Sequence, residues 1–531
     1  MNRRPETFLL LFVVLFVGLQ GCYPSKVATS VPPEGLVGTG QKITTPARVV
    51  LRDATVVLFP GGFTVQNNAL QGQGEQCLLT GKRKPIQMLK FPLEDVAAIT
   101  KYELQNSSGE ISGSFFQGIF GTAVTTLSVY CLVCPKCCFG SCPTVYTFDG
   151  SKYNLEAELF SQCIAKKLEE SDTDILTEPV PPDNLYKIRL TNEALETHYI
   201  NQFTVFAAYR PKGTKVFSSN DGDPVLVGSV RPPNKVVSRS GRTVTGMVQS
   251  EDSLSYRSDD PTTAGLLTGD PMDWLDVTFD VPEGATECRL VARLKNTLLS
   301  TVLLYNLVLA SQGFRTLSWQ DRMDSDEVYA TMFRNVYQTF SGVTIKVLRD
   351  GEWIQTASIH DVGPLAWKTV TFVVPVDHAG EQTVRFQFVA DNFMIDNIGI
   401  ERTPPISQAP LVEELKLVEV LDNSGKTRND ILPLVSQVDA RYLVTDPGQS
   451  FRMGYSVPVK PGLEATVFVK SRGYYTEWIR GKWVRENHAD YTFDLFDLRG
   501  TLAQLGREWM EGKHEIESTF FETRIPLKEA Q

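Results

Sequence analysis

Most of the chain alternates between apolar and polar residues or runs in short β-branched segments, and this pattern predicts a mainly β protein. Glycine and proline separate the segments, as at Pro60-Gly61-Gly62 near the start. We predict several β-sandwich or jelly-roll-like domains with a few inserted helices. The sequence has no repeat of fixed period, which argues against a propeller or a solenoid.

The first residues of the chain have a different pattern. Two arginines precede an apolar run from Phe8 to Val17, and Gly21 precedes Cys22. Basic, apolar and small residues in this order are typical of a secretory signal peptide. The segment resembles the lipobox of bacterial lipoproteins, in which a cysteine becomes the first mature residue and carries diacylglycerol. We predict a signal peptide at 1–21 and lipid on Cys22. The alternative is an uncleaved membrane helix, for which the run is short.

The predicted lipid on Cys22 determines the expected location of the body. It would be extracytoplasmic and held at a membrane surface by its acyl chains. Tyr23 follows Cys22 where an aspartate would favour retention in an inner membrane, so in a Gram-negative host the resemblance implies the outer membrane. Export also places the body in an oxidising compartment, where disulfides form.

Composition describes an ordinary globular body. Charged residues make up 21% and hydrophobic residues 42% of the chain, and 531 residues are enough for three or four domains with cores of their own. The net charge is −10, with a pI near 5.3. Because no excess of basic charge is available to neutralise phosphates, we predict no nucleic-acid partner.

Shifts in pattern along the mature chain predict its domain boundaries. Residues 22–45 lack periodicity and are predicted to form a tether. The other boundaries follow from groups of strands and from glycine-rich and proline-rich breaks. They give a small β domain at 46–105, an apolar segment with a cysteine cluster at 110–142, a β domain at 143–261, a jelly-roll-like β domain at 262–402 with two inserted helices, a linker at 403–410 and a C-terminal β domain at 411–531.

Local patterns predict one hairpin and the two inserted helices. Asp149-Gly150 lies between alternating segments and predicts a type I′ turn, in which both central residues have positive φ. The helices are predicted at 297–313 and 324–342. The second has Asp324 or Ser325 as its predicted N-cap. Its predicted core-facing stripe repeats every four residues, at Val328, Met332, Val336 and Phe340.

An uncharged stretch between Glu110 and Lys136 is long enough to cross a bilayer. Its glycines and hydroxyl residues are tolerated in membrane helices, where small residues let helices approach closely. The same residues, together with Gln117, lower its hydrophobicity. Two interpretations stay open: Ser112–Val133 contacts the membrane, or it is buried inside a domain.

Five cysteines crowd into the twelve residues that follow, CLVCPKCCFGSC. Their spacing comes close to a ferredoxin run, but four residues separate Cys137 from Cys142 where that run has three. An iron–sulfur cluster would also need assembly before export, and a zinc–thiolate site is the other metal alternative. An oxidising compartment favours disulfides instead, with Cys138 and Cys142 as the preferred pair. Without Cys22, eight candidates remain: Cys77, Cys131, Cys134, Cys137, Cys138, Cys142, Cys163 and Cys288.

The segment CFGSCPTVYTFDGSKYNLEAELF, residues 138–160, resembles a group of uncharacterised bacterial envelope lipoproteins built around a CFGSCPT-x-Y or TFDG-x-x-Y core. Similar phrases later, such as LDVTFDVPEGATECRLVARLKNT, extend the likeness in patches over most of the mature chain. The group has no assigned activity, so the resemblance implies an envelope address and no reaction. Cysteines 131, 134 and 137 are additional to the usual pair of the group.

Motifs of common enzymes are absent from the sequence. It contains no G-x-S-x-G elbow, no H-E-x-x-H and no phosphate-binding P-loop. Its five histidines are not spaced as metal ligands. We therefore predict no catalytic residues.

Two pairs of aspartates are candidate metal ligands. Asp221 and Asp223 have the oxygen density of a calcium loop but lack its downstream glutamate. Asp391 and Asp396 resemble the closing strand of jelly-roll domains, where such residues line a metal or sugar site. The alternative for each pair is structural, as part of a turn or at the end of a strand.

An aromatic set near the C-terminus is a candidate platform for stacking sugar rings. Its spacing along a strand equally fits core and edge positions. The set comprises Tyr474, Tyr475, Trp478 and Trp483.

These patterns predict a membrane-anchored, extracytoplasmic, non-enzymatic scaffold or binding lipoprotein of the cell envelope that engages a protein or a glycan. The predicted cofactor set is empty apart from covalent lipid on Cys22, with calcium or zinc as alternatives. The alternative functions are a glycan-directed enzyme and an envelope-assembly component inserted through Ser112–Val133. Paired carboxylates about 5 to 9.5 Å apart in a cleft would indicate the enzyme. A flat face with exposed aromatic residues would indicate binding.

Overall fold

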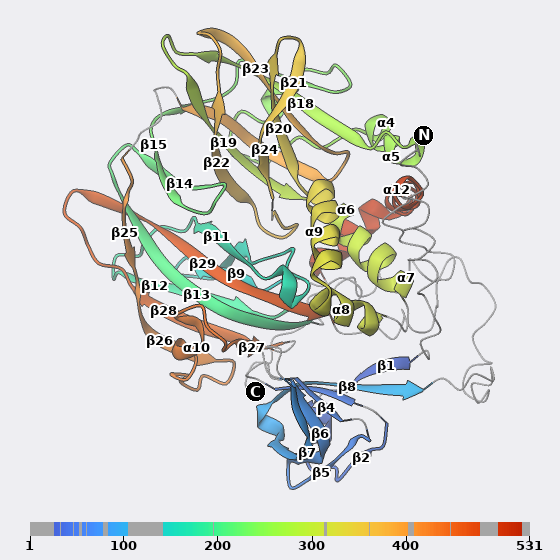
Figure 1. Ribbon diagram of the computed structural model, residues 1–531. Coiled ribbons are helices and arrows are strands. Elements are labelled where there is room, and N and C mark those ends of the chain that lie inside the picture. The colour runs from blue at the N-terminus through green and yellow to red at the C-terminus, as the bar shows by residue number, and fades with distance from the viewer. Residues whose placement is uncertain are drawn as a thin grey trace, which may run out of the picture.

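The computed structural model describes residues 26–104, 142–477 and 498–522, apart from short gaps at 32, 46, 52–55, 60, 78–82, 195, 313–315, 361, 402–407 and 446–447. Strands hold 48% of the described residues and helices 21%, so the described part of the protein is mainly β, as its alternation predicts. The described residues form five sheets, which we name A to E. Figure 1 shows the N-terminal sheet A below two pairs of packed sheets, B with C and D with E. The predicted signal peptide, Cys22 and Ser112–Val133 lie outside the described residues.

Sheet A is the N-terminal β domain. Its strand order is β1-β8-β3-β4-β6-β5-β2, with β7 on β6. Residues 26–43, predicted to be part of a tether, instead supply two of its strands, and β1 pairs with β8 from Lys26↔Leu104 to Val31↔Ile99. Its elements are β1 (Lys26–Val31), η1 (Pro33–Leu36), β2 (Lys42–Ile43), β3 (Ala47–Leu51), β4 (Val56–Phe59), β5 (Phe63–Gln66), β6 (Ala69–Cys77), β7 (Arg83–Pro92), η2 (Leu93–Asp95) and β8 (Val96–Leu104).

Sheets B and C form the central β-sandwich. Sheet B has the order β10-β9-β12-β28-β26, and sheet C has the order β11-β29-β13-β25 with β27 on β13. The strands are β9 (Thr144–Phe148), β10 (Tyr153–Glu158), β11 (Glu170–Leu176), β12 (Leu185–Thr191), β13 (Glu196–Pro211), β25 (Leu411–Glu414), β26 (Lys416–Asp422), β27 (Leu443–Thr445), β28 (Ser450–Ser456) and β29 (Leu463–Glu477). Strands predicted to form separate domains at 143–261 and 411–531 are thus paired within the same two sheets.

Sheets D and E form a jelly-roll-like insert between β13 and β25. Sheet D has the order β15-β14-β22-β19-β24-β16, and sheet E has the order β17-β18-β23-β20-β21. The insert therefore begins earlier than the predicted 262. Its strands are β14 (Lys215–Ser219), β15 (Pro224–Val227), β16 (Val230–Arg231), β17 (Lys235–Ser238), β18 (Met272–Val281), β19 (Glu287–Asn296), β20 (Val343–Arg349), β21 (Glu352–Ile359), β22 (Lys368–Pro375), β23 (Gly380–Val389) and β24 (Phe393–Glu401).

Helices cover the region where the sandwich meets the insert (Figure 1). The first predicted helix is split into α6, a π-helix and α7. The helical elements are η3 (Lys166–Leu168), η4 (Thr245–Met247), α4 (Asp260–Thr263), α5 (Gly265–Thr268), α6 (Leu299–Val302), the π-helix η5 (Leu303–Leu309), α7 (Ala310–Gln312), α8 (Thr316–Ser325), α9 (Glu327–Ser341), α10 (Leu432–Val435) and α12 (Leu498–Glu522). In the described part of the chain no helix combines the length and apolar character that a membrane crossing requires.

Helix α9 corrects two details of its prediction. Its N-cap is Asp326, whose side chain accepts a hydrogen bond from the Tyr329 N–H, because Asp324 and Ser325 still belong to α8. Val328 is 71% exposed and Met332 is 40% exposed, so the four-residue stripe does not face the core as a whole. The residues that do face the core are Ala330, Phe333, Tyr337 and Phe340.

The hairpin at Asp149-Gly150 joins β9 to β10 through a four-residue loop, since Phe148 pairs with Tyr153. Gly150 has φ +99°, but Asp149 does not have positive φ, so the predicted type I′ turn is wrong. The Asp149 carboxylate accepts hydrogen bonds from the Ser151 and Lys152 N–H groups, which stabilise the longer loop. These hydrogen bonds hold the pKa of Asp149 well below its usual range.

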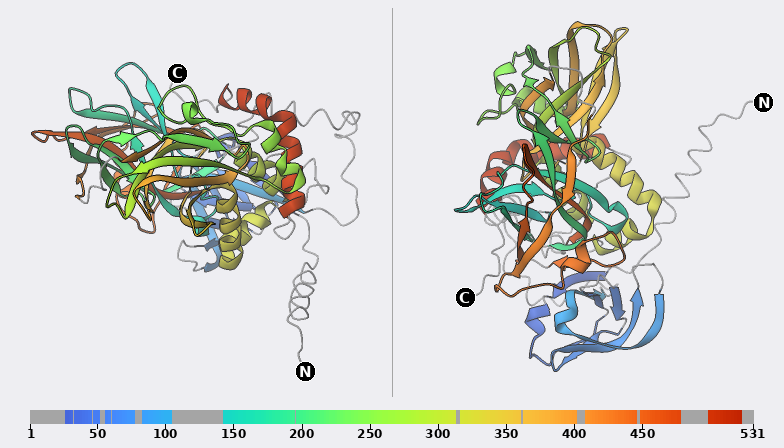
Figure 2. Two further views of the ribbon diagram at one scale, coloured as in Figure 1. Left: turned by 90° about the horizontal axis from the view of Figure 1, so that it is seen from above. Right: turned by 90° about the vertical axis from the view of Figure 1, so that its left-hand side faces the viewer.

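The C-terminal helix α12 lies within 411–531, which was predicted to be a β domain, so the helix was missed. It packs on α5 and α6, with Leu505 and Trp509 fully buried. Figure 2 shows it lying across the junction of sandwich and insert. The apolar positions Leu502, Leu505, Trp509 and Ile516 follow helical spacing, so the sequence carried a signal for this element.

Candidate functional site

Asp391 and Asp396 are buried and already matched by cationic side chains. Asp391 lies in the turn between β23 and β24 with φ +59°. Its carboxylate accepts hydrogen bonds from Arg257 Nε, from Trp509 Nε1 at 2.8 Å and from Lys513 Nζ at 3.4 Å. Asp396 forms an ion pair with Arg293. The two carboxylates therefore stabilise the end of the jelly-roll and its contact with α12.

Asp221 and Asp223 lie in the exposed turn between β14 and β15. The Ser219 hydroxyl accepts hydrogen bonds from the N–H groups of both, at 3.2 and 3.0 Å, and Gly222 has φ +85°. No third acid joins them, and no group of three or more His, Cys, Asp or Glu residues suited to a metal ion occurs within the described ranges.

The aromatic set divides into a buried part and a part outside the described residues. Tyr474 is 5% exposed and Tyr475 is 2% exposed. Tyr474 stacks on Tyr199 with ring centroids 4.6 Å apart, and the Tyr475 hydroxyl donates to the Ser161 carbonyl at 2.9 Å. The two tyrosines are core residues and offer no open ring face. Trp478 and Trp483 lie outside the described residues.

The candidate disulfide cysteines divide in the same way. Cys142, Cys163 and Cys288 are buried, and no disulfide joins any two of them. Cys77 ends β6, and nothing is described of its side chain. The preferred pair cannot be placed, because Cys138 lies outside the described residues together with Cys131, Cys134 and Cys137.

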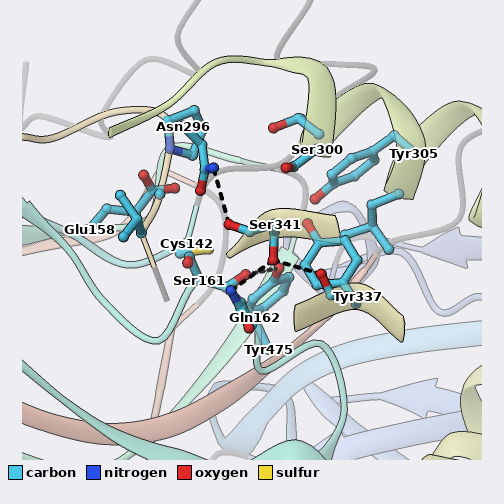
Figure 3. A pocket seen from close by; sticks show the side chains of 15 residues that line it. Cys142, Glu158, Ser161, Gln162, Asn296, Ser300, Tyr305, Tyr337, Ser341 and Tyr475 are labelled. Carbon is cyan, nitrogen blue, oxygen red and sulfur yellow. Dashed lines mark hydrogen bonds between the residues drawn. The ribbon is translucent and has the colours of Figure 1, made fainter. Parts of the chain in front are cut away.

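A small polar recess lies where the sandwich, the insert and the helices meet (Figure 3). Glu158 lies on one side of it, and Tyr305 and Tyr337 lie on the other. The cavity volume is about 30 Å³, which is room for about two water molecules, because one needs about 10–15 Å³. Gln162 and Asn296 bridge its wall by donating to the Ser341 hydroxyl and carbonyl, at 3.0 and 3.3 Å. The recess is thus too small for a sugar ring.

An acid cluster, which we define as Glu196, His198, Tyr305 and Glu477, lies behind the recess. The π-helix places the Tyr305 hydroxyl 3.0 Å from Glu196 Oε1 and in contact with Glu477 Oε1. Glu196 Oε2 is 3.1 Å from His198 Nε2. The two carboxyl groups thus share one hydroxyl group.

Tyr305 belongs both to the recess and to the acid cluster, but burial keeps the two carboxyl groups of the cluster away from the recess. Glu196 is 0% exposed and Glu477 is 4% exposed, and neither lines the cavity. Burial, together with the nearby acids, raises the pKa of Tyr475 well above its ordinary value, so this tyrosine stays neutral. The paired carboxylates are therefore part of the packed junction and do not form the open cleft that would indicate a glycan-directed enzyme.

The outer face of sheet E carries a second constellation, which the sequence reasoning missed. We call it the Trp–Arg stack, and it consists of Arg239, Trp274, Arg385 and Trp353. The guanidinium carbon of Arg385 lies 4.5 Å from the ring centroid of Trp274 and 4.0 Å from that of Trp353. Arg239 lies 5.0 Å from the Trp274 centroid. Cations and aromatic rings thus alternate across neighbouring strands, which is a favourable cation–π geometry.

Strand alternation directs these side chains outward. In β18, Leu275 and Val277 are buried while Trp274 and Asp276 are partly exposed. Asp276 pairs directly with Arg385 of β23 and accepts two hydrogen bonds from its guanidinium, at 2.7 and 2.8 Å. A tryptophan at a polar position of an alternating strand was the available sequence signal, because such positions face solvent.

An exposed apolar side chain borders the stack. Leu348 pairs directly with Trp353 and is 49% exposed, whereas Ile354, which is 45% exposed, pairs with the buried Val347 and so points to the other face of β21. Both lie in the β20–β21 hairpin, and β21 is the edge strand of sheet E. The face therefore places aromatic and guanidinium groups in contact beside an exposed apolar side chain.

No family model matches the sequence, and no curated protein matches it. Among solved structures, a carbohydrate binding module from Cellvibrio mixtus lichenase 5A, in complex with cellotriose, aligns at 9% identity and a TM-score of 0.14, covering 38% of this chain and 98% of the module. The GH31 alpha-xylosidase from Xanthomonas citri aligns at 9% identity and a TM-score of 0.15, covering 85% of this chain and 38% of the xylosidase. Alignments with TM-scores this low carry no argument about function.

Proposed function

We propose that the protein is a lipid-anchored, non-enzymatic binding protein of the bacterial cell envelope, and that it engages its partner through the outer face of sheet E. The Trp–Arg stack is the observation that carries this proposal. Tryptophan and arginine contribute most strongly to binding energy at interfaces. Here the ring contacts and the Asp276 hydrogen bonds already hold the side chains in place, so little further entropy is lost on binding.

The anchor in this proposal rests on the signal-peptide pattern that ends at Cys22. Strand β1 begins at Lys26, so lipid on Cys22 would hold sheet A close to the membrane surface. Sheet A and sheet E lie at opposite ends of the described chain in Figure 1 and in the right-hand view of Figure 2. The stack would then face away from the lipid, where a partner can reach it.

Photo-crosslinking in cells tests the binding surface. A benzophenone amino acid replaces Gln355, an exposed residue of β21, in the full-length chain. The matched control carries it at Met332 of α9, which is also exposed. We expect a discrete adduct from position 355 that position 332 does not give. Equal adducts from both positions, or none from position 355, would contradict the proposed surface.

Mass spectrometry of the mature N-terminus tests the anchor separately. We expect a first residue at Cys22 that carries acyl chains. An intact N-terminus from Met1, or an unmodified thiol at Cys22, would contradict the lipoprotein part of the proposal while leaving the binding surface untouched.

A further inference from the structure

The Trp–Arg stack ends at Trp353. Strand β18 lies between β17 and β23. Arg239 directly follows β17 and Arg385 lies in β23, and both guanidinium groups lie over the Trp274 ring. Trp353 has Arg385 over its ring but no second cation or ring partner among the residues that the structure describes. Because β21 is the edge strand of sheet E, no further strand of this sheet extends past the ring.

Positive charge next to this end is left without a matching carboxylate. The neighbouring arginines are paired, as Arg385 is with Asp276 and Arg239 is with Asp270. Lys346 lies in the same face, directly opposite Arg385 on one side and Gln355 on the other. No carboxylate pairs with Lys346 within the described part of the chain. An anionic group placed here would therefore gain a charge-assisted hydrogen bond.

We infer that this end of the stack binds an anionic sugar, which rests on the proposed binding function and names its ligand class. A pyranose ring has an apolar C–H face that fits the Trp353 ring and the exposed Leu348 beside it. A ring carboxylate would be bound by Lys346, and the exposed amide of Gln355 would bind hydroxyl groups.

Charge and shape favour this ligand over other classes. A cationic ligand would approach Lys346 and Arg385, whose charges repel it. A purely apolar partner would leave the Lys346 ammonium buried and unpaired, which costs free energy. An anionic pyranose can pack its C–H face on the Trp353 ring and place its carboxylate beside the Lys346 ammonium at the same time.

Calorimetry on the full-length protein in detergent tests the inference. The probes are tetrasaccharides of galacturonate, of mannuronate and of hyaluronan, each beside its carboxyl-reduced neutral counterpart. We expect at least one acidic probe to bind at least about tenfold more tightly than its reduced form, as expected for one charge-assisted contact. Lys346→Gln should remove that difference and leave the affinity for the neutral form unchanged.

Matched variants distinguish loss of this site from the loss of any tryptophan or any lysine side chain. Trp353→Ala should abolish binding of the acidic probe, whereas Trp367→Ala should not, although Trp367 also lies under cations, Arg293 and Lys295. Lys235→Gln, an exposed lysine of β17, is the control for charge. Thermal unfolding shows that each variant is folded.

The outcomes distinguish the inference from the function beneath it. Equal affinity for acidic and reduced probes would overturn the anionic class and leave a glycan-binding face. No sugar binding, with a protein captured from position 355, would overturn the inference and support the proposed function. No sugar binding and no adduct would overturn both.

Discussion

The junction behind the recess and the outer face of sheet E both bring aromatic rings next to charged groups, and they differ in burial. At the junction, Glu196 and Glu477 are at most 4% exposed and share the Tyr305 hydroxyl. On the outer face, Arg385 and Asp276 keep 18% and 28% of their side-chain surface exposed. Buried polar groups need their partners to avoid a desolvation cost, whereas exposed ones are partly served by water. The charged groups of the junction therefore contribute mainly to stability, and the outer face of sheet E remains the surface that we propose for binding.

Replacing Asp391 should produce the largest effect. Asp391→Ala leaves Arg257 and Lys513 without their shared buried carboxylate, and breaking a buried ion pair costs about 3–5 kcal/mol. The free energy of unfolding from urea titration measures it. Asp276→Ala on the outer face is the control, and we expect a loss of about 1 kcal/mol or less. Equal losses would remove the distinction between the two regions.

Removing the shared hydroxyl of the acid cluster should have a smaller effect. Tyr305→Phe keeps the ring and deletes the donor to Glu196 and Glu477, so we expect a loss of about 1–3 kcal/mol in the free energy of unfolding. Tyr329→Phe, a variant of a partly exposed tyrosine that accepts from Trp319, is the matched control and should lose less. A neutral result for Tyr305→Phe would show that the cluster does not depend on this hydroxyl.

Asp273, buried beneath the stack, should give a pH-dependent effect. Burial raises its pKa, although Tyr256, Ser258 and Trp274 donate hydrogen bonds to it. The folded state thus prefers the neutral carboxyl, and this contribution is fully present below the ordinary value of about 3.9. It is lost as the pH rises through the raised folded value.

The measurement compares the wild type with Asp273→Asn, which does not titrate. From about pH 3 towards neutrality, the free energy of unfolding of the wild type should fall relative to that of the variant. A difference that stays constant, or one that changes in the opposite direction, would show that burial does not control this carboxyl group.

Trp353→Ala should change stability least, by about 0.5–1 kcal/mol, because exposed cation–π contacts contribute about that much. Urea titration checks this value. Trp509→Ala, which empties a fully buried site at the junction, is the contrast and should cost about 3–5 kcal/mol. A large loss from Trp353→Ala would place the stack among the structural elements and weaken its assignment to binding.

Local pattern predicted the fold class but not the grouping of the strands. Alternation identifies β12 and β28 as strands, yet nothing local pairs residues 185–191 with residues 450–456. The α9 stripe failed for a related reason. A strict four-residue step drifts around a helix of 3.6 residues per turn, whereas the observed steps of three and four, at Ala330, Phe333, Tyr337 and Phe340, remain on one face.

The candidate sites were likewise predictable only as far as local pattern determines them. The adjacent Tyr474 and Tyr475 suggested a platform, but neighbours in a strand point to opposite faces, and both faces of β29 are covered at this end. Trp274 was identifiable from its polar position, since the apolar residues of this strand alternate at Leu275, Val277 and Phe279 and leave Trp274 on the other face. Its partners Arg385 and Trp353 come from other strands, and only the pairing of β18, β23, β20 and β21 brings them together.

The insertion of sheets D and E between β13 and β25 has a consequence for how the chain reaches its native state. Strands β28 and β29 are the last of the sandwich to be synthesised, yet they occupy inner positions of sheets B and C. The sandwich is therefore complete only when residues near 477 have been made, because β11 pairs in sheet C with β29 alone, whereas the insert can close on itself earlier. Such long-range closure slows folding and exposes strand edges, so refolding should proceed in two kinetic phases, the insert first.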